Sequence, residues 1–112
     1  MTVTTSALCG GIDVVRRGDA TVVALWGAID ATLRVEAGRA LASALERDVP
    51  IEIDMTRTTL IDSAGLAFLI QLCLLGRDEG MSVSVIGASP IVAEALHLLG
   101  LPGVAATSAP AP

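Results

Sequence analysis

The chain has 112 residues, of which 53% are hydrophobic but only 2% aromatic, and its formal net charge at pH 7 is -5. This length predicts a single domain that buries a core built from Ala, Val, Leu and Ile. The acidic balance, with only 7 Lys and Arg spread along the chain, argues against nucleic acid as a partner, because that partner requires clustered basic residues.

The cysteines and the apolar segments indicate the cellular compartment of the chain. Cys9 and Cys73 are too few for a disulfide framework and indicate reduced thiols. The longest apolar run, residues 65–75, is interrupted by Gln71 and is shorter than the about 20 residues of a membrane-spanning helix. The N-terminus lacks the basic residues of a secretory signal. We therefore expect a cytoplasmic protein without direct membrane insertion.

Two antiparallel strands are the first expected elements, over residues 12–16 and 21–26. Gly18 and Asp19 between them predict a two-residue hairpin turn. The run VVALW is apolar without alternation, which predicts a strand covered on both faces. Residues 1–11 are expected to form a frayed N-terminus.

An amphipathic helix over residues 32–47 and a third strand over residues 51–55 follow. The helix carries an apolar stripe at helical spacing, made of Leu33, Ala37, Ala40, Leu41, Ala44 and Leu45. Pro50 ends the connection after it. The strand alternates apolar and polar residues, and the polar run 56–59 predicts its end.

The centre of the chain predicts the start of a buried helix. Asp62 and Ser63 precede Ala64, Gly65 and the long apolar run, which is the pattern of an N-cap region. The Ser63 hydroxyl is thus expected where backbone N–H groups lack partners and the helix dipole favours negative charge, so that a phosphate would be stabilised there. An ordinary helix cap is the alternative interpretation of Ser63.

The remaining residues predict a strand over 81–85 and a helix that begins with Ser89 and Pro90. His97, the only histidine, is expected on the outer face of that helix, and residues 107–112 are expected to be a disordered tail. The order of elements predicts an α/β fold whose mixed sheet has an N-terminal antiparallel hairpin followed by parallel strands, with helices packed against it. Residues 1–106 would form one domain.

Catalytic chemistry is not expected. Ser63 has no base near it in sequence, and the chain has no Gly-x-Ser-x-Gly elbow, phosphate-binding Gly-rich loop or metal-ligand cluster. The sequence therefore predicts a protein that is not an enzyme and that binds no cofactor or metal.

The string LIDSAGLAFL resembles the signature of the STAS family, the domain of bacterial anti-sigma factor antagonists, and the resemblance covers about residues 12–100. It implies that Ser63 is the serine phosphorylated by a partner anti-sigma factor with serine kinase activity. Asp62, Gly65 and Leu66 match the residues around that serine. Two positions depart from the family pattern, because Ala64 replaces a second Ser or Thr and Ala67 replaces a common Gly.

The segment GAID at residues 27–30 extends the resemblance and places Asp30 close to the phosphorylatable serine, although a helix cap explains Asp30 equally well. The resemblance implies an antagonist that binds the anti-sigma factor when unphosphorylated, is inactivated by phosphorylation and is reset by a phosphatase. The expected partner-binding residues are Asp30, Asp62, Ser63, Ala64, Gly65 and Leu66.

A non-enzymatic scaffold or accessory subunit is the alternative function. STAS-like domains also occur in stressosome-type assemblies and as partners of lipid-transporting ABC systems. The apolar helix 66–75 favours this alternative, because it would present a docking patch if it were not wholly covered.

Overall fold

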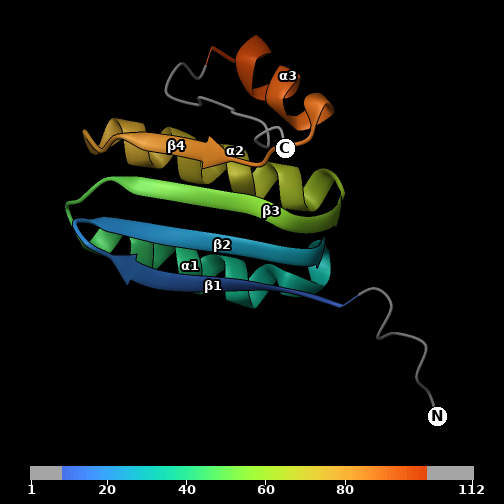
Figure 1. The fold of residues 1–112 in the computed structure, drawn as a ribbon, viewed down its shortest axis with the longest axis horizontal. Coiled ribbons are helices and arrows are strands. Elements are labelled where there is room, and N and C mark those ends of the chain that lie inside the picture. Colours follow the sequence, from blue (N-terminus) through green and yellow to red (C-terminus); the bar gives the residue numbers. More distant parts are fainter. Residues whose placement is uncertain (1–8, 101–112) are drawn as a thin grey trace.

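The computed structural model describes residues 9–100, which form a four-stranded mixed sheet with helices packed against it (Figure 1). The strands lie in sequence order, β1 to β4, and their bounds are Gly10–Arg17, Ala20–Ile29, Ile51–Ile61 and Val83–Ile86. β1 pairs antiparallel with β2, whereas β3 pairs parallel with both β2 and β4. The predicted fold class is confirmed. Residues 1–8 and the predicted tail 107–112 lie outside the described residues.

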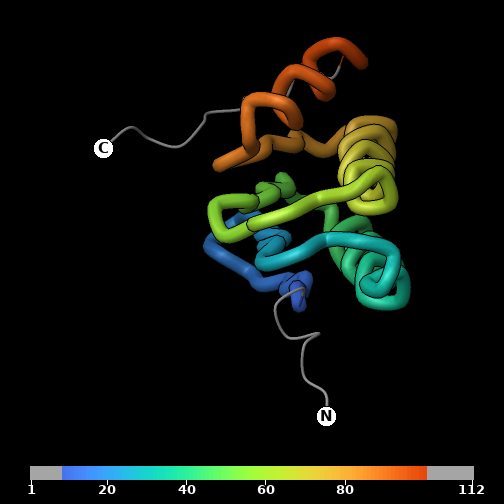
Figure 2. The backbone as a smooth tube through the Cα atoms, turned by 90° about the vertical axis from the view of Figure 1, so that its right-hand side faces the viewer, coloured from blue at the N-terminus to red at the C-terminus, as the bar shows by residue number. Residues whose placement is uncertain are grey.

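The helices comprise a 3-10 turn, η2, at Ala31–Leu33, and the α-helices α1 at Arg34–Glu46, α2 at Ser63–Asp78 and α3 at Pro90–Leu98. α1 and α2 lie side by side on one face of the sheet, while α3 lies beyond the β4 edge (Figure 2). The core lies between the sheet and α1 and α2 and extends to α3 through Val92 and Leu96. Its fully buried members include Val23, Leu25, Ile53, Leu69 and Leu72.

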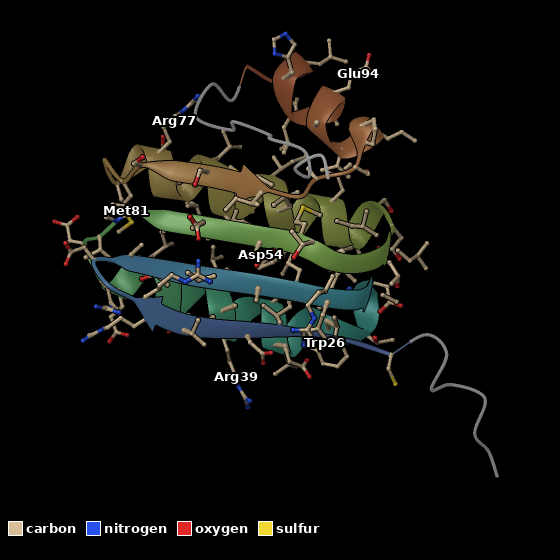
Figure 3. The ribbon with its side chains drawn as sticks, viewed as in Figure 1. Trp26, Arg39, Asp54, Arg77, Met81 and Glu94 are labelled. Atoms are coloured by element: carbon tan, nitrogen blue, oxygen red, sulfur yellow. The ribbon has the colours of Figure 1, made fainter. Side chains whose placement is uncertain are left out.

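The prediction that β2 is covered on both faces is wrong. No described helix covers the second face of the sheet, over which Trp26 and Asp54 lie (Figure 3). Val22 is nevertheless only 1% exposed. Val22 lies between Val15 of β1 and Glu52 of β3, and Glu52 also forms an ion pair with Arg17 of β1 at 3.2 Å. An apolar run in a strand therefore does not require a second layer of helices.

The hairpin forms as predicted, with Gly18 and Asp19 in the turn and Gly18 at φ +60°. β1 begins two residues earlier than expected, because Gly10 and Gly11 pair with the end of β2. A Cβ on Gly11 would lie 2.3 Å from the Trp26 ring, so a larger residue there would force this side chain to move. The prediction of a frayed segment over residues 1–11 is therefore wrong for residues 9–11, since the Cys9 carbonyl also accepts a hydrogen bond from the Ala28 N–H at 3.1 Å.

The third strand is twice as long as predicted, because the polar run 56–59 does not end it. β4 pairs only with residues 51–54 of β3, so the rest of β3 has β2 as its only strand neighbour. The register with β2 shifts twice in this part, after Asp54 and after Thr58. Thr56, Arg57 and Thr59 of this part are exposed, so the polar run lies at the surface of the strand.

The last helix agrees with the sequence. The Ser89 hydroxyl accepts a hydrogen bond from the Val92 N–H at 3.3 Å, and Pro90 is the first helical residue. His97 is exposed, as predicted.

Candidate functional site

The candidate site lies where β2 and β3 end. Ile29 and Ile61 are paired in the parallel register, and the Asp62 N–H donates to the Ile29 carbonyl at 3.2 Å. Asp30 and Asp62 directly follow these paired residues. The sheet therefore brings two acidic residues that are 32 positions apart in the sequence to one edge, as the resemblance implied.

Asp62, and not Ser63, is the N-cap of α2. The Asp62 carboxylate accepts a hydrogen bond from the Gly65 N–H at 3.0 Å, and Ser63 is the first residue of the helix. The interpretation of Ser63 as an ordinary cap is therefore wrong. Ser63 is exposed, and its hydroxyl bonds to no other described residue. A solvent-exposed hydroxyl that makes no hydrogen bond to the described residues is accessible to chemical modification.

Gly65 allows α2 to begin against the sheet. A Cβ on this residue would lie 2.4 Å from the Ile29 carbonyl oxygen and 2.8 Å from a side-chain carbon of Ile61. Any larger residue would push the helix away from the ends of β2 and β3. Gly65 is buried, so its contribution to the site is to hold Asp62 and Ser63 beside Asp30.

Asp30 caps η2, as the cap interpretation expected. Its Oδ1 accepts hydrogen bonds from the N–H of Thr32 at 3.0 Å and from the Thr32 hydroxyl. The bond from the Thr32 side chain is the main cause that lowers the pKa of the carboxyl group, and the backbone bond adds to it. Asp30 therefore carries a full negative charge at neutral pH.

The predicted partner-binding residues differ in exposure. Asp62, Ser63 and Ala64 are exposed and Asp30 is partly exposed. Leu66 is partly buried and packs against the core, and Gly65 is buried. Four of the six side chains are thus accessible to solvent, whereas the Gly-Leu pair has a packing role.

A groove of about 500 Å³ runs between α1 and α2 and reaches this site. Ala37 and Gly38 line it from α1, and Ala64 and Ala67 line it from α2. Buried apolar side chains form its floor and include Ile29, Leu33 and Phe68. Asp30 and Arg34 also line it. We call this feature the α1–α2 groove.

Most residues of the α1–α2 groove were not predicted as site residues. Ala37 was expected in the buried stripe of its helix, but it is only partly buried. Gly38 was not predicted either, although a glycine inside a helix is a signal for close approach or a special packing need. The sequence does not indicate which helix faces which, so it could not combine these residues.

The described residues carry neither a metal cluster nor a membrane span. No group of three or more His, Cys, Asp or Glu side chains within residues 9–100 could hold a metal ion. No helix in that range is long and apolar enough to cross a membrane.

Comparison with protein-family models assigns the chain to a family. Residues 12–106 match the family described as "Mlab, STAS domain". The match covers most of the chain, so the protein belongs to the STAS-domain family. The comparison with curated proteins found no match.

Solved structures with the same fold include two anti-sigma factor antagonists and a stressosome chain. An anti-sigma factor antagonist from Mycobacterium paratuberculosis superposes with a TM-score of 0.67 at 20% identity, covering 90% of this chain and 87% of the other. Unphosphorylated SpoIIAA, an anti-sigma factor antagonist, gives a TM-score of 0.70 at 16% identity, covering 91% and 90%. A stressosome chain gives 0.59 at 24% identity, covering 86% and 87%. At these identities the likeness establishes the fold.

Proposed function

We propose that this chain is a non-enzymatic anti-sigma factor antagonist. In its unphosphorylated form it binds an anti-sigma factor that is also a serine kinase, and so releases a sigma factor for transcription. Phosphorylation of Ser63 ends the binding, and a phosphatase restores it. The observation that carries the proposal is the exposed Ser63 hydroxyl at the first position of α2, next to the Asp62 cap and the end of β2.

The position of Ser63 suits a phosphate switch. The hydroxyl stands at a helix N-terminus, where backbone N–H groups and the helix dipole favour negative charge. A kinase can reach it without unfolding the helix, since Asp62 supplies the cap. The phosphorylated protein therefore keeps its fold, and only the surface of the site changes.

The same position explains how phosphorylation would end binding. A phosphate adds about -1.5 to -2 charge at pH 7. The added group stands beside Asp62 on a surface that a partner must cover closely, and a kinase partner brings its own nucleotide phosphates to that surface. Bulk and repulsion then oppose the complex, and the ATP and magnesium belong to the kinase.

A binding experiment with the histidine-kinase-like ATPase that is encoded nearest to the gene of this chain tests the proposal. Wild-type protein should bind it and dissociate after ATP is added, Ser63→Ala should stay bound with ATP, and Ser63→Asp should bind weakly. Radiolabelled ATP should label wild type and leave Ser63→Ala unlabelled. Equal labelling of both proteins would remove Ser63 as the acceptor and with it the proposed switch.

An accessory or scaffold subunit is the second candidate. The family match is described as "Mlab, STAS domain" and does not itself name an anti-sigma factor. The outer face of α2 is also poor in charge, with Ala64, Ala67 and Leu74 exposed along it. This candidate predicts that a transporter or stressosome component is the coding neighbour. ATP should then not change the binding of wild type or of Ser63→Ala to that component.

A further inference from the structure

The α1–α2 groove contains space that the fold of this chain does not use. Gly38 lies inside α1 and lines the groove, and a Cβ placed on it meets no heavy atom within 4 Å. Glycine inside a helix destabilises the folded state relative to alanine. The chain therefore has a glycine where an alanine would fit and would stabilise the helix, and the open space lies above an apolar floor.

Small residues form the middle part of both walls of the groove. Ala37 and Gly38 on one side and Ala64 and Ala67 on the other extend no further than a methyl group, whereas the larger side chains of Leu41 and Gln71 line the groove one turn further along the two helices. Small side chains on two neighbouring helices let a third helix approach closely and insert its larger side chains between them. Leu33 and Phe68 lie below and provide apolar contact.

The rim of the groove is charged at the end near the site. Both hydrogen bonds from Thr32 go to Oδ1 of Asp30, and Oδ2 accepts none from a described residue. Thr32 thus fixes the orientation of the carboxylate and leaves one oxygen for a donor outside the chain. Arg34, four residues later, also lines the groove and offers a positive charge. A matching ligand carries a basic group opposite Asp30 and an acceptor opposite Arg34.

We propose that the α1–α2 groove binds an amphipathic helix of the protein partner. Its apolar side chains, at i, i+3, i+4 and i+7, enter the groove above Phe68, and a Lys or Arg in its first turn binds Asp30. The inference rests on the proposed function for the presence of a protein partner, because Ala64 belongs both to the groove and to the surface around Ser63. A partner that covers Ser63 closely also covers this end of the groove.

A defined peptide tests the groove without the natural partner. The probe is a helical peptide of about 15 residues, the length at which isolated helices become stable, with leucines on one face, a Lys in the first turn and a Glu in the second. One control peptide has the same composition with the leucines spread around the helix, and another has Glu in place of the first-turn Lys. The readout is the change in amide shifts of the ¹⁵N-labelled chain.

The groove variants should separate the outcomes. The probe should perturb amides of α1 and α2 along the groove, and Gly38→Leu should weaken its binding at least about tenfold, the loss expected for a blocked central contact. Ala42→Leu is the matched control, because Ala42 is exposed on the same helix and does not line the groove. It should leave the affinity unchanged, and the peptide with Glu at the Lys position should bind less well than the probe.

The inference is overturned if the perturbations map elsewhere, such as to the open face of the sheet, if the scrambled peptide binds as well, or if Gly38→Leu and Ala42→Leu behave alike. Its failure is distinct from failure of the proposed function. Labelling of Ser63 with no effect of Gly38→Leu on the kinase complex would keep the switch and remove the groove. Peptide binding in the groove with no phosphorylation of Ser63 would keep the groove and remove the switch.

Discussion

Asp30 and Asp54 form the same local structure in two different parts of the molecule. In each case Oδ1 of the aspartate accepts hydrogen bonds from the N–H and the hydroxyl of the threonine two residues later, Thr32 or Thr56. Asp54 makes this turn on the open face of the sheet, where β3 bulges (Figure 3). Asp30 makes it at the end of β2, beside Asp62.

The two aspartates differ in position and not in their hydrogen bonds. The hydrogen bonds to threonine explain local chain direction in both places, so they do not mark a binding site. Only the position of Asp30, at the parallel strand ends that carry Ser63, sets it apart. Asp54 therefore serves as an internal control for every experiment on Asp30.

The largest expected effect comes from breaking the geometry that gives Asp30 its position. Gly65→Ala should lower the free energy of unfolding by about 2 to 3 kcal/mol, because its Cβ would lie 2.4 Å from the Ile29 carbonyl oxygen and overpacking of this kind is costly. Urea unfolding measures the change. A variant as stable as wild type would mean that α2 does not need Gly65 to reach the strand ends.

Substitutions of the two aspartates should differ in their effect on the affinity for the partner. Asp30→Asn should weaken the complex with the anti-sigma factor about tenfold, as expected for a lost hydrogen bond between charged groups, and the effect should shrink at high salt. Asp54→Asn should leave the affinity within a factor of about two. Calorimetric titration measures both, and equal losses for the two variants would contradict the special position of Asp30.

A smaller effect of opposite sign is expected in α1. Gly38→Ala should raise the free energy of unfolding by about 0.5 to 1 kcal/mol, because alanine is the better helix former and its Cβ meets no neighbour. Thermal unfolding of both variants should show a higher free energy of unfolding for Gly38→Ala and a lower one for Gly65→Ala. A destabilised Gly38→Ala variant would show that the space in the groove is not free.

The smallest effect is the pH dependence of stability. Thr32 lowers the pKa of Asp30 through its side-chain and backbone bonds. For Asp54, partial burial is the largest single influence and raises the pKa, but the Thr56 bonds with Arg17 and Arg57 together lower it below its usual value. A lowered folded-state pKa contributes stability above the unfolded value of about 3.9, and this contribution is lost as the pH falls through the folded value.

Unfolding measured between neutral pH and the acid range checks this sign. Asp30→Asn and Asp54→Asn should each flatten the loss of stability below about pH 4, because asparagine has no proton to bind. If neither variant changed the slope, the threonine bonds would not stabilise the ionised carboxylates.

The local signals of the sequence predicted much of the fold. The Gly18–Asp19 turn and the Ser89–Pro90 helix start depend on neighbouring residues alone, and both are confirmed. The end of β3 was missed because residues 57–61 remain paired with β2 through two register shifts, and this pairing cannot be read from the polar run alone. The identity of the α2 cap was also missed, since Asp62 and Ser63 are equally good caps and only the helix geometry selects Asp62.

The site residues that belong to the family motif could be predicted from the sequence. The residues that only tertiary packing brings together could not. The resemblance led to Ser63, Asp62 and Asp30, and the parallel register of β2 and β3 brings the strand ends that carry them to one edge. Gly38 and Ala67 could not be assigned to a common groove, because the facing of α1 and α2 follows from the tertiary packing.

The most direct test of the central claim is the intact mass of the protein isolated from its native host, with and without phosphatase treatment, followed by mapping of any phosphate. We predict a phosphatase-sensitive mass increase that maps to Ser63 and disappears in Ser63→Ala. A phosphate on another residue, or none under any growth condition, would contradict the switch and favour the docking subunit.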